Sequence, residues 1–139
     1  MKPERCEGCP LYGAPGPVFG VGPRDAELML LGEAPGVEDA LRHEPFVGPA
    51  GKVLSVACHL AGVAREKVYI TNTVKCLPPR RGESHAPTKE EVEFCKSRWL
   101  NEELAEISPR VVVPIGGVAL EALTGLRGIT EWRGSVMEV

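Results

Sequence analysis

The sequence lacks any long hydrophobic run. Its longest nearly apolar stretch, residues 111–120, is interrupted by Pro114 and two glycines and is too short to cross a bilayer as a helix. The N-terminal residues are charged from Lys2 onward and offer no apolar core for a secretory signal. We therefore expect a cytoplasmic monomer that contacts no membrane.

An excess of positive charge is also absent. The formal net charge is -3, whereas proteins that bind DNA by charge alone are usually basic overall. Basic residues do concentrate between Lys75 and Lys89, where only Glu83 opposes them. The candidates for contact with a phosphate backbone are Lys75, Arg80, Arg81 and His85. On charge alone, the alternative of a solvated loop balanced by acidic neighbours is favoured.

Nucleotide-binding loops are missing as well. Residues 32–36, Gly-Glu-Ala-Pro-Gly, follow an apolar segment but contain neither the Gly-Lys-Ser/Thr ending of a phosphate loop nor a Gly-x-Gly-x-x-Gly fingerprint. A glycine-rich loop at the end of a buried strand is nevertheless where open α/β sheets place their ligands. We expect a ligand site there that is not built for a nucleotide cofactor.

The chain length of 139 residues and its 43% hydrophobic content predict one domain, residues 1–139, with one core. Short apolar or β-branched runs at 27–31, 68–71 and 111–115 predict strands buried on both faces. Residues 134–139 begin a fourth strand that the sequence hardly completes.

Helical periodicity separates these strands. After Pro49 one apolar stripe is formed by Ala50, Leu54, Ala57, Cys58 and Ala61. A second helix begins at a capping box of Thr88 and Glu91 and ends before Pro109, and a third covers 117–126. Strands that alternate with helices predict an α/β fold with a mainly parallel sheet.

Four of the five cysteines form a candidate metal site. Cys6 and Cys9 have the two-residue spacing that lets both thiolates reach one metal, and Cys76 and Cys95 complete a set of four. Four thiolates suit either a tetrahedral zinc or an iron-sulfur cubane, and composition does not separate the two. Cys58 lies on the first helix stripe and is expected to be a core residue.

Two longer stretches resemble family 4 uracil-DNA glycosylases. Residues 32–36, Glu38-Asp39 and 45–51 are similar to the first motif block of that family, and 71–79 are similar to the second. The four cysteines fall where the cluster ligands of the family are expected. The resemblance implies a [4Fe-4S] cluster in place of zinc, a three-layer α/β/α sandwich with a four-stranded parallel sheet, and excision of uracil from DNA during base excision repair.

The resemblance also implies roles for single residues. Phe46 would stack on an extruded uracil, because an aromatic face stacks on any base, and Asn72 would pair with its polar edge. Glu33 would orient water or the developing sugar cation. Backbone N–H groups of Gly32, Ala34 and Gly36 would face the departing uracil.

One part of the family pattern has no counterpart here. Family members carry a His-Pro-Ser block whose histidine stabilises the uracil anion, and none of His43, His59 and His85 lies in that context. The resemblance therefore implies a chain truncated at its C-terminus, with impaired glycosylase activity or a purely DNA- or uracil-binding role. His85 lies near the place where a related branch has a covalently reacting histidine, although a surface histidine is the simpler interpretation. A zinc-stabilised module unrelated to DNA is the third alternative.

Overall fold

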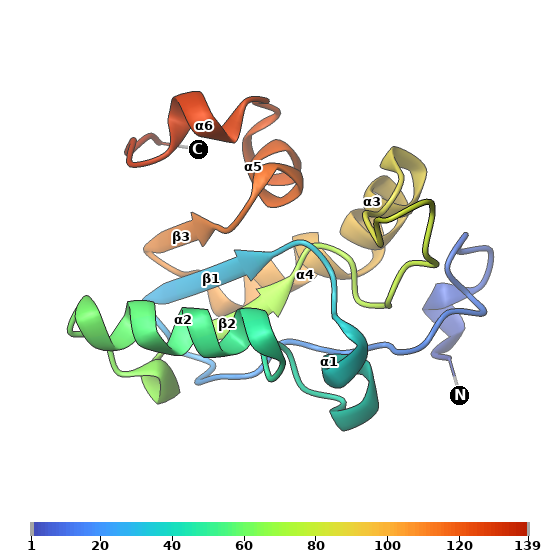
Figure 1. Cartoon of the computed structure of the whole chain (residues 1–139), viewed down its shortest axis with the longest axis horizontal. Coiled ribbons are helices and arrows are strands. Elements are labelled where there is room, and N and C mark those ends of the chain that lie inside the picture. The colour runs from blue at the N-terminus through green and yellow to red at the C-terminus, as the bar shows by residue number, and fades with distance from the viewer. Residues whose placement is uncertain (1, 139) are drawn as a thin grey trace.

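A computed structural model describes residues 2–138 and contains a small parallel sheet. The strands are β1 (Leu28–Gly32), β2 (Tyr69–Asn72) and β3 (Val111–Pro114). They lie in the order β2-β1-β3, and β1 pairs in parallel with both neighbours (Figure 1). The predicted α/β class with a parallel sheet is confirmed.

The expected fourth strand is wrong for the part of the chain that the structure describes. Residues 134–138 form no strand, and Val139 lies outside the described residues. They follow Gly134, whose φ is 77°, and Val136 is 99% exposed. This segment therefore pairs with none of the three strands of the sheet.

Helices connect and surround these strands. They are η1 (Glu4–Cys6), α1 (Val37–Arg42), α2 (Pro49–Leu60), η2 (Arg65–Lys67), α3 (Lys89–Cys95), the π-helical η3 (Lys96–Leu100), α4 (Asn101–Ile107), α5 (Gly117–Thr124) and α6 (Ile129–Trp132). Across residues 2–138, no helix is long and apolar enough to span a bilayer.

The predicted second helix runs continuously through α3, η3 and α4. Its capping box is confirmed, because Thr88 Oγ1 accepts the Glu91 N–H at 3.2 Å and a Glu91 carboxylate oxygen accepts the Thr88 N–H at 3.3 Å. Both contacts satisfy N–H groups that a helix start leaves without intrahelical partners. The short helices α1 and α6 were not predicted, because both lie in stretches rich in glycine or breaking residues.

Alternate residues of the strands pack on opposite faces of the sheet. Leu30 and Ile70 contact Cys58 and Leu54 of α2, while Leu31 on the other face packs with residues of η3, α4 and α5. Figure 1 shows α2 in front of the sheet and α4 behind it. Helices thus contribute to the core on both faces, and the complete three-layer sandwich stays a prediction.

Helix α2 corrects one detail of the predicted apolar stripe. Leu54 and Cys58 face the sheet as expected, and Cys58 is a buried core residue. Ala50, Ala57 and Ala61 are exposed instead. Side-chain size does not explain this difference, because Val53, Val56 and Leu60 of the same helix are exposed as well.

The ends of β1 and β2 lie side by side at one edge of the sheet. Gly32 and Asn72 are the last residues of these strands and are direct partners in the register. The loops 33–36 and 73–88 both leave from this edge. In a parallel sheet the carboxyl ends of strands are where ligand sites form, so this edge positions the candidate site.

Candidate functional site

Three of the predicted site residues meet at the end of β1. A Cβ placed on Gly32 would lie 2.4 Å from Asn72 Oδ1 and 2.5 Å from Phe46 Cζ. Only glycine leaves space for the amide and the aromatic ring at this point. The structure therefore brings Gly32, Phe46 and Asn72 together, from two strand ends and the loop before α2.

The side-chain amide of Asn72 is buried without a partner. The residue is 1% exposed, and neither Nδ2 nor Oδ1 has a hydrogen-bond partner among the described residues. Leaving a buried polar group unpaired costs about 1–3 kcal/mol, so most buried polar groups in proteins are paired. The amide therefore offers one unused donor and one unused acceptor next to Phe46.

The backbone around this amide is fixed. The Thr73 N–H and hydroxyl both donate to the Gly32 carbonyl at 2.8 Å, and Lys75 Nζ donates to the Asn72 carbonyl at 2.7 Å. The Val74 N–H donates to the Glu33 carbonyl at 3.0 Å. These contacts join the two strand ends, so the unpaired amide is held in place by its main chain.

The loop that carries Phe46 is held by two side chains. The Asp39 carboxylate accepts the N–H of Gly36 at 3.1 Å and that of Val47 at 2.9 Å. The Arg65 guanidinium donates to the Phe46 carbonyl at 2.6 Å. Asp39 belongs to the motif recognised in the sequence, whereas no sequence pattern pointed to Arg65.

The remaining residues of the glycine-rich loop have different surroundings. Glu33 is half-buried, and this burial raises the pKa of its carboxyl above 4.5. Ala34 packs against the core cluster that includes Cys76 and Cys95. The N–H of Gly36 is already bonded to Asp39, which removes it from the expected ligand donors.

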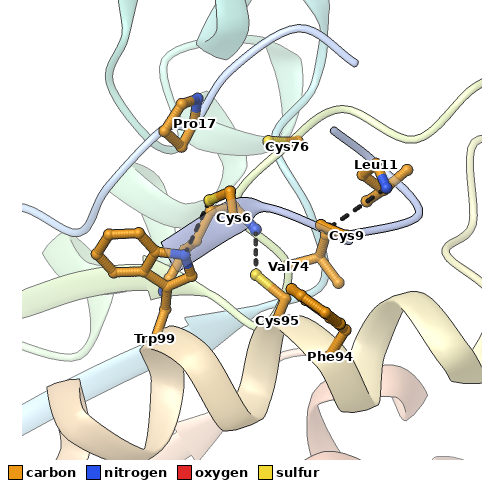
Figure 2. Close-up of a pocket in the computed structure, with 10 residues that line it drawn as sticks. Cys6, Cys9, Leu11, Pro17, Val74, Cys76, Phe94, Cys95 and Trp99 are labelled. Carbon is orange, nitrogen blue, oxygen red and sulfur yellow. Dashed lines mark hydrogen bonds between the residues drawn. The ribbon is translucent and has the colours of Figure 1, made fainter. Parts of the chain in front are cut away.

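The four predicted ligand cysteines line a single pocket. Cys6, Cys76 and Cys95 are buried and Cys9 is half-buried, and Trp99 lines the same pocket (Figure 2). The fifth cysteine, Cys58, lies elsewhere, against the sheet face covered by α2. The N-terminal segment, the loop after β2 and the end of α3 thus contribute to one cluster of thiols.

Each of these sulfur atoms accepts an N–H group. The donors are Trp99 Nε1 to Cys6 at 3.4 Å, the Leu11 N–H to Cys9 at 3.3 Å, Lys2 Nζ to Cys76 at 2.8 Å and the Lys75 N–H to Cys95 at 3.3 Å. Such donors stabilise negative charge on sulfur, which thiolate ligands of a metal carry. The donor set therefore fits a soft metal or an iron-sulfur cluster.

Burial makes two of these thiols harder to ionise. Burial raises the pKa of Cys95 to about 11 and raises that of Cys76 above its usual range. Within residues 2–138, no three His, Cys, Asp or Glu side chains already have metal-binding geometry. Metal ligation would need these thiols to lose their protons.

One of the four expected DNA contacts is wrong. Lys75 is 1% exposed, and its Nζ lies 2.6 Å from Glu103 Oε1 and 2.7 Å from Thr71 Oγ1. Directly after β2 the Lys75 side chain turns to the sheet face that α4 covers, where the Glu103 carboxylate needs a cation. It has no free charge to offer to a phosphate.

The other three lie on the loop between β2 and α3. Arg81 forms an ion pair with the buried Glu91, while Arg80 Nε donates to the Gly82 carbonyl at 3.0 Å. His85 Nδ1 lies 2.9 Å from the Pro78 carbonyl oxygen. All three residues are exposed, on a loop that leaves the sheet beside Asn72.

Comparison with known proteins points to one family. A family model described as the uracil DNA glycosylase superfamily matches residues 19–138. A Type-4 uracil-DNA glycosylase of Archaeoglobus fulgidus is 42% identical over 88% of this chain and 62% of its own length. One from Thermotoga maritima is 36% identical over 97% of this chain and 70% of its own length. A Type-5 uracil-DNA glycosylase of Thermus thermophilus is 36% identical over 81% of this chain and 56% of its own length. The chain thus spans about three fifths of the first of these relatives.

Proposed function

Because this chain belongs to the uracil-DNA glycosylase superfamily, we propose that it binds uracil-containing DNA and hydrolyses the N-glycosidic bond of deoxyuridine. The unpaired amide of Asn72, buried beside Gly32 and Phe46, is the observation that carries this proposal. Uracil presents a carbonyl group next to an N–H group, and one carboxamide can pair with both.

Recognition would begin with a nucleotide turned out of the helix, because its glycosidic bond is inaccessible within the base stack. The Phe46 ring would stack on the base. Asn72 Oδ1 would accept the base N–H, and Nδ2 would donate to a uracil carbonyl. A base without this pattern would leave the buried amide unpaired, which is how such a site discriminates.

Bond cleavage would be favoured by the same contacts. As the glycosidic bond breaks, negative charge grows on uracil, so a donor already aimed at its carbonyl binds the transition state more tightly than the substrate. Glu33 lies next to the Gly32 backbone. In its carboxylate form it would orient water or stabilise the positive charge on the sugar.

The four cysteines would hold a [4Fe-4S] cluster, or a zinc ion as the alternative. When bound, the cluster supplies a cross-link between segments that are far apart in the sequence. Cys76 follows Asn72 by four positions, so ligation at Cys76 would restrict the chain directly after the recognition amide. No electron transfer is needed for this role.

The exposed Arg80 and His85 would face the DNA backbone, since their loop leaves the sheet at the edge where the site lies. The same pocket would also serve a protein that binds uracil in DNA without cleaving its glycosidic bond. Stacking on Phe46 and pairing with Asn72 need no bond cleavage, so the same contacts would support that second function.

Excision from an oligonucleotide with a single uracil tests the proposal. The 139-residue chain is purified anaerobically beside Asn72→Ala, and the exposed Asn101, changed to Ala, is the matched control. We expect release by the unchanged chain and by Asn101→Ala, and none by Asn72→Ala. Uracil-specific DNA binding without release would identify the binding module. The absence of both binding and release would overturn the proposal.

A further inference from the structure

We propose that Arg65 is a positioning residue that holds Phe46 in the conformation required for base stacking. This inference rests on the proposed function. Arg65 lies in η2, beyond the end of α2, and does not touch the Asn72 amide. Its effect on the site passes through the backbone of Phe46.

The hydrogen bonds of Arg65 all converge on the loop and the first turns of α2. The guanidinium donates to the Phe46 carbonyl at 2.6 Å, to the Gly51 carbonyl at 3.0 Å and to the Ser55 hydroxyl. Among residues 2–138, no carboxylate forms an ion pair with it. A rigid fork of donors is therefore used to join two carbonyl groups that belong to different turns of the chain.

The backbone of Phe46 needs such support. Its φ is 56°, in the left-handed region that residues with a side chain rarely adopt. Conformations of this kind persist only where the surroundings determine them. The Phe46 carbonyl also presses against α2, because a Cβ on Gly51 would lie 1.9 Å from its oxygen. Arg65 binds that same oxygen.

The conformation of Phe46 decides where its ring lies. Cζ and Cε2 of the ring reach the place that a Gly32 Cβ would occupy, and Asn72 Oδ1 reaches the same place. If the Phe46 carbonyl left Arg65, relaxation of φ would swing the ring away from the amide. Misplacement by about 1 Å costs catalysis on the order of a hundredfold.

Fluorine NMR follows the ring independently of activity. The chain has three phenylalanines, so 4-fluorophenylalanine labelling gives resonances for Phe19, Phe46 and Phe94, with assignment by substitution. We expect Arg65→Met to shift or broaden only the Phe46 resonance. Arg110→Met, which changes an exposed arginine, should leave all three unchanged. An unaltered Phe46 resonance in Arg65→Met would overturn the proposal.

Uracil excision provides the second readout, in a double-mutant cycle. We expect Arg65→Met to lower kcat/KM roughly ten- to hundredfold, and to have no further effect once Phe46 is Ala. An equal loss in both backgrounds would contradict the positioning role. If the unchanged chain neither binds nor excises uracil, the proposed function fails, while the fluorine spectra still decide whether Arg65 holds Phe46. Should Arg65→Met not fold, Arg65→Gln, which lacks the guanidinium fork, is judged by the same criteria.

Discussion

The Asn72 side-chain amide lies against the backbone of Gly32, its partner across the parallel sheet, in a space that has no room for a Cβ. The Gly32 carbonyl is bonded by Thr73, so the main chain at this point is satisfied, but the amide is not. The structure thus contains an unpaired polar group on a rigid support, which is expected to favour ligand binding over stability.

Replacing Asn72 should therefore separate activity from stability. Asn72→Ala removes a buried amide whose desolvation costs about 1–3 kcal/mol, and this relief offsets the packing that is lost. We expect its free energy of unfolding to equal or exceed that of the unchanged chain in urea titrations. Thr73→Ala is the matched control, because it removes a satisfied buried hydrogen bond and should cost about 1 kcal/mol. A larger loss for Asn72→Ala than for Thr73→Ala would show that the amide is paired.

The cysteines should divide into four ligands and one packing residue. If the proposed [4Fe-4S] cluster is bound, we expect Cys95→Ser to lose the iron, the sulfide and the brown absorbance of an anaerobically purified protein, because a proposed cluster ligand is removed. Cys58→Ala should keep all three, since Cys58 packs against Leu30 and Ile70 away from the thiol pocket. Metal analysis of the unchanged chain distinguishes iron from zinc. Retention of metal in Cys95→Ser would remove that residue from the ligand set.

Glu33 should make stability depend on pH. Burial raises its pKa in the folded chain above 4.5, so the folded state favours the protonated form. Glu33 therefore contributes favourably to the free energy of unfolding at pH values below its pKa in the unfolded chain. This contribution is lost as the pH rises through its pKa in the folded chain. In Glu33→Gln the side chain does not ionise, so this pH-dependent contribution is absent.

We therefore expect Glu33→Gln to be more stable than the unchanged chain at pH 8, with a difference that shrinks toward pH 5. Urea unfolding across this range measures it, and Glu44→Gln, at an exposed position, is the control. Across the same pH range, Glu33→Gln should excise uracil more slowly than the unchanged chain, because the proposed role needs the carboxylate. A difference in stability that does not vary with pH would contradict the assigned cause.

Much of the fold was predictable because its signals are local. The three strands are short apolar or β-branched runs between breakers, and the Thr88–Glu91 capping box marks the start of α3. The meeting of Gly32 and Asn72 follows from two strand ends in one parallel sheet. The cysteine set followed from spacing and resemblance, and all four cysteines line one pocket.

The errors concern contacts between segments that are distant in the sequence. Lys75 was predicted at the surface because its partner, Glu103, lies on a helix 28 positions later. Arg65 carries no local pattern, and only the folded chain brings it to Phe46. In α2, periodicity identified an apolar side, but of its predicted members Leu54 and Cys58 pack against the sheet while Ala50 and Ala57 are exposed. Tertiary pairing of this kind is not encoded in periodicity.

The buried pair of Lys75 and Glu103 should be costly to break. Their side chains are 2% and 12% exposed, and the Tyr69 hydroxyl donates to the same carboxylate at 2.8 Å. Lys75→Met leaves Glu103 without a counter-ion in the core, which typically costs about 3–5 kcal/mol. Arg24→Met, which breaks an exposed pair with Glu106, should cost less than about 1 kcal/mol.

The double variant Lys75→Met/Glu103→Leu distinguishes attraction within the pair from the penalty of an unpaired charge. We expect it to recover most of the stability lost in Lys75→Met, because apolar side chains of similar size need no counter-ion. Uracil excision should not recover in parallel, since Lys75 Nζ also bonds the Asn72 carbonyl and the double variant lacks this contact. Urea unfolding and excision are measured on the same preparations. Full recovery of both would mean that the Lys75 ammonium only compensates the charge of Glu103 and does not position Asn72.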